Sequence, residues 1–573
     1  MMRTLVYLGC NLVWISFYLV RYLLFRISVY FPRQVQTRYL RRLVRENRYT
    51  VFGREHQFDN VASIPDFQQL VPLSTYESYQ HYIEQIGCGD PSVLTEERVD
   101  LLELSSGSTS ASKLIPYTKA LKKEFGNGIG PWMFDMYLRN PSLLLGTAYW
   151  SITPLAKMEK TYTAGGIPIG FEEDSEYFGR VEKFLIETLM AVPPEVKHVS
   201  SNASFRYLTL FFLLQNRDLT FISVWNPTFL SILLDDLRMY WEPLLTDMKQ
   251  GSLTPPEPIA ENLKEQLLRR VKPDERRAAE LRTLGSAQYR HIWPKLRLIS
   301  CWTDGNSALY AEQLRQRVSG IRVKGKGLIA TEGFISFPVE GTDSSVLAIR
   351  SHFYEFIDVE EQTGQTHLAH ELTVGNRYSV VITTGGGLYR YRLQDVVEVT
   401  GYMGRTPLIR FVGKADKVSD HFGEKLNEQH VSEVLDMLCL RLAVSPDFLL
   451  LAPDCTYHTY HYTLYIETDQ ELDTDRLVEQ LDAGLCQNFH YAYCRRLGQL
   501  TRPRIYKVSG SGAVSYLRRL QAEGQKLGNI KPSSLHAKMG WSEWFAGIYL
   551  DSPEMIQSSG TSPSDPNLSL RHR

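Results

Sequence analysis

The chain has 573 residues, 43% of them hydrophobic and 22% charged, so it can bury more than one core and is too apolar to be disordered. Its formal net charge of -1 supplies no field that would draw it onto nucleic acid, and nucleic acid is not expected as a partner. Seven cysteines without a CxxC pair argue against a disulfide framework or a zinc site and favour a reducing, cytoplasmic setting.

The first segment is an apolar run followed by a basic flank. Thr4 to Val20 carries no charge and is at the short limit for a bilayer span. Residues 1–50 contain nine arginines against one acidic residue, Glu46, and no small-residue cleavage site of a secretory signal follows the run. We predict an N-terminal helix over residues 1–35. Two interpretations stay open: residues 4–31 contact a membrane from the cytoplasmic side, or the helix packs on the protein itself.

The rest of the chain mixes helical and strand-like patterns. Residues 36–90 carry apolar positions at helical spacing, and Arg98 to Leu104 reads as a buried strand. This mixed order continues to about residue 415 and indicates an α/β fold. We expect a large domain over residues 36–415, a smaller α+β domain over 416–550, and a disordered Ser/Pro-rich tail over 551–573.

A loop dense in hydroxyls and small side chains follows the strand and ends in one lysine. Nucleotide phosphates need close backbone N–H groups, hydroxyl donors and a positive charge, and small side chains permit that approach. A solvated Ser-rich turn is the alternative. No glycine precedes the lysine and the following LIPYT reads as a strand, so this is not a Walker loop. The candidate phosphate-binding residues are Ser105, Ser106, Gly107, Ser108, Thr109 and Lys113.

The segment LSSGSTSASKLIPYT resembles the first signature of the adenylate-forming superfamily of acyl-CoA synthetases, adenylation domains and luciferases. Within it, the segment is most similar to the Gretchen Hagen family of acyl acid amido synthetases, the auxin-responsive enzymes of plants and their bacterial relatives. The loop is one residue shorter and has Ala111 where the family often has glycine. The resemblance covers roughly residues 35–535 and implies a large adenylate-forming domain and a small α+β domain joined by a hinge at Asp416.

Two further segments agree with this resemblance. LIATEGFISF resembles the second signature, which implies an α-phosphate contact for Thr331 and a Mg²⁺ ligand in Glu332. A carboxylate beside a triphosphate needs a bridging metal, because it would otherwise repel the phosphates. Leu328 stands where relatives often carry tyrosine. Tyr354 in HFYEFI matches an aromatic position near the adenine, with burial in a strand as the alternative.

The third signature is the most specific. GGGLYRYRLQDVVEVTGY resembles the family's Tyr-Arg-x-x-Asp block, which implies that Asp395 accepts hydrogen bonds from the ribose hydroxyls of ATP. Lys425 aligns with a lysine that contacts phosphate or the acyl-adenylate. Lys531, before a proline in NIKPSSL, matches the lysine that enters the active site and neutralises charge on the phosphate; an exposed loop is the alternative.

These residues predict an ATP- and Mg²⁺-dependent ligase. It would activate a carboxylic acid as acyl-AMP with release of pyrophosphate, then transfer the acyl group to an amine, on the family's example an amino acid. Rotation about a hinge at residues 416–419 would separate the two half-reactions. Thioester formation with coenzyme A and a catalytically inactive, membrane-associated relative are the alternatives. Tyr149, Trp150 and Phe229 are candidates for the lining of the acyl pocket.

Overall fold

The computed structural model describes residues 2–105, 113–151, 161–170, 185, 188–361, 364–414, 418–456, 459–525 and 530–550. It forms two compact units. The first unit consists of Met1–Asp416 and a returning segment, Leu520–Pro532; the second consists of Lys417–Arg519 and Ser533–Arg573. The predicted tail over 551–573 lies outside the described residues.

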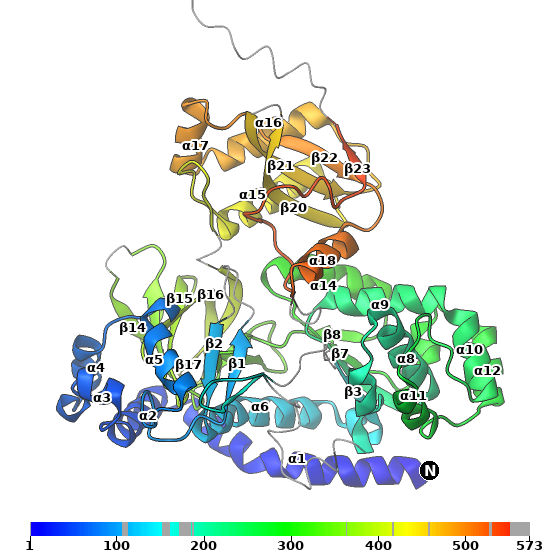
Figure 1. The fold of residues 1–573 in the computed structure, drawn as a ribbon, viewed down its shortest axis with the longest axis horizontal. Coiled ribbons are helices and arrows are strands. Elements are labelled where there is room, and N and C mark those ends of the chain that lie inside the picture. The colour runs from blue at the N-terminus through cyan, green and yellow to red at the C-terminus, as the bar shows by residue number, and fades with distance from the viewer. Residues whose placement is uncertain are drawn as a thin grey trace, which may run out of the picture. The chain divides into compact units, whose positions relative to one another are not determined.

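The first unit begins with helices, as the apolar spacing predicts. They are α1 (Met2–Ser28), α2 (Pro32–Glu46), α3 (Val51–Glu55), α4 (Ile64–Leu70), α5 (Tyr76–Cys88) and, further on, α6 (Lys119–Arg139). Short 3-10 helices lie at Phe58–Asn60, Pro141–Leu145, Pro194–His198 and Gly305–Ser307. Helix α6 runs beside α1 (Figure 1).

Helix α1 is part of the hydrophobic core along one face. Trp14, Tyr18, Tyr22 and Phe25 repeat at helical spacing and are buried, and the Tyr22 ring stacks on Phe134 of α6 at 4.7 Å between centroids. In the described part of the chain, α1 is the one helix long and apolar enough to cross a membrane, a test that a core helix also passes. Its buried face shows that it packs on the protein in this structure.

Within the described residues, the first unit contains three sheets of four or more strands. A mixed sheet has the order β2-β1-β5-β4, a fully parallel sheet has the order β3-β6-β7-β8, and an antiparallel sheet has the order β11-β12-β17-β16-β15-β13-β14. The mixed sheet consists of β1 (Leu101–Ser105), β2 (Lys113–Tyr117), β4 (Thr161–Tyr162) and β5 (Pro168–Ile169). The parallel sheet consists of β3 (Thr147–Trp150), β6 (Leu219–Ser223), β7 (Leu298–Ser300) and β8 (Arg322–Lys324).

The antiparallel sheet follows the parallel sheet in the chain. Its strands are β11 (Ser336–Pro338), β12 (Ser345–Leu347), β13 (Phe353–Asp358), β14 (Thr366–Leu368), β15 (Arg377–Thr383), β16 (Tyr391–Met403) and β17 (Thr406–Lys414). A small hairpin of β9 (Ile329–Ala330) and β10 (Gly333–Phe334) precedes it.

Further helices lie beside the parallel sheet (Figure 1). They are α8 (Asn202–Gln215), α9 (Pro227–Met239), α10 (Trp241–Gln250), α11 (Glu261–Leu268), α12 (Glu275–Leu284), α13 (Tyr289–Ile292) and α14 (Ala308–Arg317). The long apolar stretches of residues 200–245 form buried helices before and after strand β6 in the chain.

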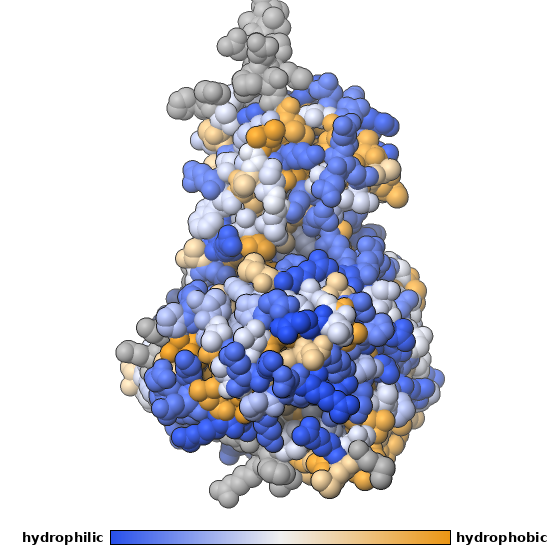
Figure 2. Space-filling model, turned by 90° about the vertical axis from the view of Figure 1, so that its right-hand side faces the viewer, coloured by the Kyte–Doolittle hydropathy of each residue, from blue (hydrophilic) through white to orange (hydrophobic). Residues whose placement is uncertain are grey.

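The second unit has its own core and an α+β fold. Its sheet has the order β20-β21-β22-β23, formed by β20 (Phe448–Thr456), β21 (Thr459–Glu467), β22 (Arg504–Val508) and β23 (Gly547–Tyr549). A hairpin of β18 (Val418–Ser419) and β19 (Leu426–Asn427) precedes helices α15 (Glu428–Leu442), α16 (Thr474–Leu485), α17 (Phe489–Arg496) and α18 (Gly512–Ala522). The predicted fold class, an α/β domain followed by a smaller α+β domain, is confirmed. Figure 2 shows one face of the molecule, where hydrophilic residues predominate and hydrophobic residues form small patches.

Candidate active site

The predicted phosphate loop connects two paired strands. β1 and β2 are antiparallel, with Ser105 opposite Lys113, so these two residues mark the ends of the loop. Lys113 Nζ lies 5.7 Å from the centroid of the Tyr76 ring. Residues 106–112 lie outside the described residues, so the roles of Ser106, Gly107, Ser108 and Thr109 stay predictions.

The second signature lies at the tip of the β9–β10 hairpin. Ala330 pairs with Gly333, which leaves Thr331 and Glu332 as the two residues of the turn. Tyr117 of β2 donates from its hydroxyl to the Thr331 carbonyl at 2.7 Å. Ser105 Oγ donates to Glu332 Oε1 at 3.3 Å. The structure thus brings together two predicted site residues, Ser105 and Glu332, that are 227 positions apart.

A buried polar network fixes the backbone that follows Glu332. The Phe334 amide donates to His352 Nε2 at 2.9 Å, so the imidazole proton is on Nδ1, which lies 3.0 Å from Glu124 Oε2. Glu124 also accepts from the Tyr39 hydroxyl at 2.6 Å and from the Gly385 amide at 2.9 Å. Burial, then the Glu124 charge, raises the pKa of Tyr39 well above its usual value. A fully satisfied buried network of this kind fixes one geometry.

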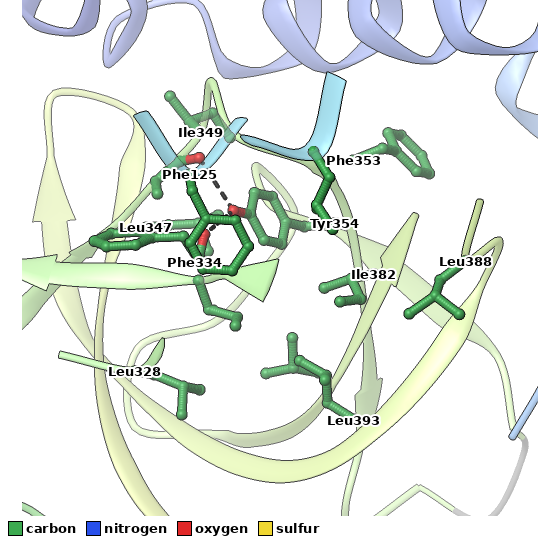
Figure 3. Close-up of a cluster of buried hydrophobic side chains, with 14 of the residues drawn as sticks. Phe125, Leu328, Phe334, Leu347, Ile349, Phe353, Tyr354, Ile382, Leu388 and Leu393 are labelled. Carbon is green, nitrogen blue, oxygen red and sulfur yellow. Dashed lines mark hydrogen bonds between the residues drawn. The ribbon is translucent and has the colours of Figure 1, made fainter. Parts of the chain in front are cut away.

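Tyr354 lies in the hydrophobic core. Its side chain has no exposed surface, and Figure 3 shows it among Phe125, Phe334 and Ile349. Its hydroxyl lies 2.8 Å from the Phe334 carbonyl and 3.1 Å from the Ala348 carbonyl. An adenine ring could reach Tyr354 only if this core opened. The structure therefore supports the alternative of burial in a strand, and we do not keep Tyr354 in the proposed site.

Leu328 is also part of this core. It is 6% exposed, and its amide donates to Ser336 Oγ at 3.0 Å. An apolar residue is suited to this buried position, which explains why leucine is accepted where the resemblance leads one to expect tyrosine.

Asp395 lies near the start of β16 and is 2% exposed. Its Oδ1 atom accepts no hydrogen bond within the part of the chain that the structure describes, although Lys414 Nζ is 3.7 Å away. A buried carboxylate oxygen without a donor is costly unless a ligand supplies one. The two hydroxyls of a ribose are such donors, so the residue fits the predicted role.

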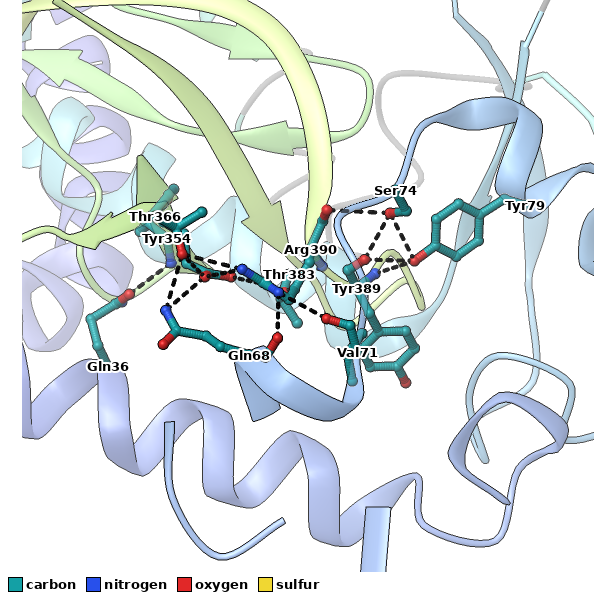
Figure 4. A network of polar contacts seen from close by, with 11 residues as sticks. Gln36, Gln68, Val71, Ser74, Tyr79, Tyr354, Thr366, Thr383, Tyr389 and Arg390 are labelled. Carbon is teal, nitrogen blue, oxygen red and sulfur yellow. Dashed lines mark hydrogen bonds and ion pairs between the residues drawn. The ribbon is translucent and has the colours of Figure 1, made fainter. Parts of the chain in front are cut away.

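The start of β16 is anchored by Arg390, which lies five residues before Asp395. Its guanidinium pairs with Glu355 through two contacts of 3.0 Å and donates to the carbonyls of Gln68 and Val71 at 2.8 Å each. Figure 4 shows Arg390 beside Gln68 and Val71. Arg390 therefore has a structural role, joining α4, β13 and β16.

The two predicted lysines lie in different units. Lys425 is exposed in the second unit, with a positive φ of 42° just before β19, and its carbonyl accepts from Asn488. Asp416, the predicted hinge residue, lies outside the described residues. Lys531 is in the returning segment of the first unit. The Asn226 side chain, 1% exposed, donates to the carbonyl of Ile530 at 2.8 Å.

An aromatic cluster lies at the carboxyl end of the parallel sheet. Trp150 ends β3, Trp225 follows β6 by two residues, Trp302 follows β7 by two residues, and Lys326 follows β8 by two residues. Ligands of open α/β sheets bind at this end of the strands. Lys531 lies here too, with Nζ 5.3 Å from the centroid of the Trp302 ring.

Of the three residues predicted to line an acyl pocket, the structure leaves one accessible. Trp150 is half-buried, whereas Tyr149 and Phe229 are 0% and 4% exposed. Trp225, Trp302 and Lys326 were not among the site residues predicted from the sequence. The two tryptophans had a signal, because each comes directly after an apolar, strand-like run, as in FISVWN and LISCWTD, whereas Lys326 lies between two glycines.

Metal ligands are few. Among the described residues, no group of three or more His, Cys, Asp or Glu side chains is arranged to hold a metal ion. Mg²⁺ in nucleotide sites is commonly bound by one or two carboxylates, with phosphate oxygens and water completing the set. The single carboxylate of Glu332, next to the predicted phosphate loop, fits a Mg²⁺ site of that type.

The fold and the order of the three signatures are those expected of one class of enzyme, the ATP-dependent adenylate-forming ligases. Three family models match the chain: the GH3 family N-terminal domain at residues 29–323, the GH3 family central domain at 345–414 and the GH3 family C-terminal domain at 429–538. The chain belongs to the GH3 family. The family predicted from the signatures is confirmed, and the protein is an acyl acid amido synthetase, a ligase that forms an amide bond by way of an acyl-adenylate.

The chain is similar to characterised enzymes and to solved structures. The chain is 24% identical to the indole-3-acetic acid-amido synthetase GH3.10 of Arabidopsis thaliana, over 82% of this chain and 86% of that protein. It is 24% identical to the jasmonoyl–L-amino acid synthetase JAR4 of Nicotiana attenuata, over 78% and 81%. The structure of AtGH3.15 acyl acid amido synthetase in complex with 2,4-DB shares the fold, with a TM-score of 0.76 at 19% identity over 91% of this chain and 94% of that chain.

Proposed function

We propose that this protein uses Mg²⁺-ATP to activate a small carboxylic acid as acyl-AMP and then conjugates the acyl group to the amino group of an amino acid. The observation that carries the nucleotide site is the buried Oδ1 atom of Asp395, which lacks a donor among the described residues. The two similar enzymes described above are named for indole-3-acetic acid and for jasmonoyl–amino acid conjugates, and these names support the proposed substrate classes.

In the first half-reaction, ATP would lie with its ribose hydroxyls on Asp395 and its phosphates on the loop between Ser105 and Lys113. Glu332, held 3.3 Å from Ser105, would bind Mg²⁺. When bound, Mg²⁺ neutralises charge on the phosphates and orients them for an in-line displacement. Thr331, beside Glu332 in the turn, would donate to the α-phosphate.

The substrate carboxylate would attack the α-phosphorus, and the bond to the pyrophosphate leaving group would break. Negative charge builds on the phosphate oxygens during this step, and a nearby ammonium group lowers its energy. We assign this role to Lys531, whose segment is fixed to the first unit by Asn226. We propose that Lys425 contacts phosphate or the acyl-adenylate.

In the second half-reaction, an amine would attack the acyl carbonyl of the adenylate, and AMP would leave. The proposed rotation would admit this nucleophile; it concerns the second unit and not the returning segment Leu520–Pro532, which belongs to the first unit. The product is an amide, which distinguishes the proposal from thioester formation with coenzyme A.

The test is exchange of labelled pyrophosphate into ATP across a panel of carboxylic acids, followed by mass spectrometry of products with each amino acid or with coenzyme A. We expect exchange with at least one acid and an amide product. Thioester without amide would assign the enzyme to the coenzyme A ligases, and no exchange with any acid would refute adenylation.

The role of Glu332 is tested by Mg²⁺ titration of the exchange reaction. Glu332→Gln should raise the Mg²⁺ concentration for half-maximal rate at least tenfold, because an amide is a neutral, weaker ligand. Glu340→Gln is the matched control, since Glu340 pairs with Lys324 away from the hairpin. Equal Mg²⁺ dependence in the two variants would exclude Glu332 as a Mg²⁺ ligand.

We also propose that α1 contacts a membrane surface without crossing it. Its outer face exposes large apolar side chains, among them Val20 at 64% and Leu23 at 51%, and the following helix α2 exposes arginines such as Arg41 and Arg45. Apolar and basic faces together bind anionic bilayers. Co-sedimentation with vesicles containing phosphatidylserine should be lost in the Val20→Glu, Leu23→Glu variant. Equal sedimentation of variant and wild type would exclude this contact.

A further inference from the structure

We propose that Lys326 is a specificity-determining residue that receives a second polar group of the acyl substrate, and that this substrate is a flat aromatic acid with a carboxylate or hydroxyl opposite its reacting carboxyl group. This inference rests on the proposed function, because it concerns which acid is activated.

Lys326 is a buried cation in an aromatic cage. It is 3% exposed, and its Nζ atom lies 5.3 Å, 6.0 Å and 5.2 Å from the ring centroids of Trp132, Trp150 and Trp225. These rings come from α6, β3 and the segment after β6. The arrangement is built by residues from four separate parts of the chain, and it therefore holds the ammonium group in one place.

The ammonium group has a hydroxyl partner but no carboxylate. Nζ donates to Ser223 Oγ at 2.6 Å, and no ion pair joins it to an Asp or Glu of the described residues. Burial without an anion lowers the pKa of Lys326 to about 7, and the buried Cys301 nearby opposes that change only in part. An ammonium group has three donors, and a buried charge without a counter-ion is unfavourable. An incoming anion would remove that penalty.

The surrounding rings offer an aromatic surface to a ligand. Trp150, Trp225 and Trp302 are each half-buried. They lie at the carboxyl end of the parallel strands, where ligands of α/β sheets usually bind. Flat aromatic molecules stack on such rings. The class of ligand that meets both the rings and the cation is an aromatic compound with an anionic or hydrogen-bond-accepting substituent.

A row of contacts links Lys326 to the proposed catalytic lysine. The rings of Trp225 and Trp302 lie 5.8 Å apart between centroids, Lys326 contacts the first and Lys531 the second. An aromatic acid placed along these rings would direct its reacting carboxylate toward Lys531 and its second substituent toward Lys326. Lys326 is thus separate from the reacting atoms and acts on the choice of substrate.

The experiment compares matched acids in wild type and in Lys326→Met, which keeps the length of the side chain and removes its charge. The pairs are benzoate against terephthalate and 4-hydroxybenzoate, and 2-naphthoate against 2,6-naphthalenedicarboxylate and 6-hydroxy-2-naphthoate. Pyrophosphate release gives kcat/KM, and calorimetry gives Kd. Wild type should favour the substituted acid at least tenfold, and Lys326→Met should lose that preference while changing less than threefold toward the parent acid. Comparison of the dicarboxylic acids with the hydroxy acids shows whether Lys326 binds a carboxylate or a hydroxyl group.

Lys324→Met is the matched control, since Lys324 is two residues away and pairs with Glu340 at 3.1 Å; it should keep the wild-type preference. An equal loss of kcat/KM for the parent and the substituted acids in Lys326→Met would mean that Lys326 only supports the fold. No preference in wild type would also overturn the proposal. Calorimetry does not need turnover, so a failure of adenylation is distinguishable from a failure of this inference.

A second readout uses wild type alone and does not depend on a folded variant. The protonated form of Lys326 binds a carboxylate, so the Kd of the dicarboxylic acid should rise about tenfold from pH 6 to pH 8, as the free lysine loses its proton around pH 7. The Kd of the parent acid should stay constant over the same range. Parallel pH profiles for the two acids would refute the role of Lys326.

Discussion

Removing the charge of Glu355 should destabilise the first unit strongly. Glu355 and Arg390 are 1% and 6% exposed, and their two contacts of 3.0 Å form a bidentate pair. Glu355→Gln leaves the guanidinium buried without its counter-ion, a change that typically destabilises by about 3–5 kcal/mol. Because Arg390 also binds the carbonyls of Gln68 and Val71, it cannot leave the core without breaking the link between α4 and β16.

The expected change can be converted into a melting temperature. The first unit has about 430 residues, and an unfolding entropy of about 2.1 cal/mol/K per residue makes 3–5 kcal/mol equivalent to about 3–6 °C. Differential scanning calorimetry of the full chain measures it. The control is Glu312→Gln, which breaks an exposed pair with Arg315 and should move the midpoint by less than about 1 °C. Equal shifts in the two variants would refute the reasoning, as would a double Glu355→Met, Arg390→Met variant less stable than Glu355→Gln.

Three further results are expected. Lys531→Ala should slow pyrophosphate exchange by about 10²–10³-fold, whereas the exposed Lys538→Ala should not; a wild-type rate in the first would exclude Lys531 from the chemistry. Asp395→Asn should raise the KM for ATP about 10–100-fold by weakening a hydrogen bond to a charged acceptor, and Glu398→Gln on the same strand should leave it unchanged. Lys326 has a pKa of about 7 in the folded state, against 10.5 as its ordinary value, so between these pH values the folded state binds fewer protons than the unfolded state. The stability of wild type relative to Lys326→Met should therefore rise by about 1.4 kcal/mol per pH unit from pH 7 to pH 9. A difference in the free energy of urea unfolding that stays constant with pH would contradict this.

Local patterns predicted the parts of the site that local chemistry builds. A strand that runs into small polar residues, and a two-residue turn between short strands, are decided by neighbours in the sequence. Ser105 was therefore predicted at the start of the loop that follows a strand, which in the structure extends to Ser105 itself, and the family resemblance supplied the expectation that this loop and Glu332 share one site. Their contact across 227 positions is a property of the folded chain alone.

Burial was the part that the sequence could not decide. Tyr354 lies in a strand with almost every side chain buried, so both faces are covered and alternation gives no guidance. Lys326 stands between two glycines, a pattern typical of a solvated loop, yet tryptophans about 100 to 200 positions away enclose it. The sequence indicates neither the enclosure of Lys326 nor the missing donor of Asp395.

The returning segment Leu520–Pro532 affects how this protein can be divided. The chain passes from the first unit to the second after Asp416, comes back at Leu520 and leaves again after Pro532. A fragment that ends at Asp416 would lack Lys531 and would leave the Asn226 amide without the Ile530 carbonyl that it binds. The units are compact, but they are not exchangeable modules. A chimaera that takes the second unit from a relative must carry the returning residues of the first, or it will combine one enzyme's substrate surface with another's lysine.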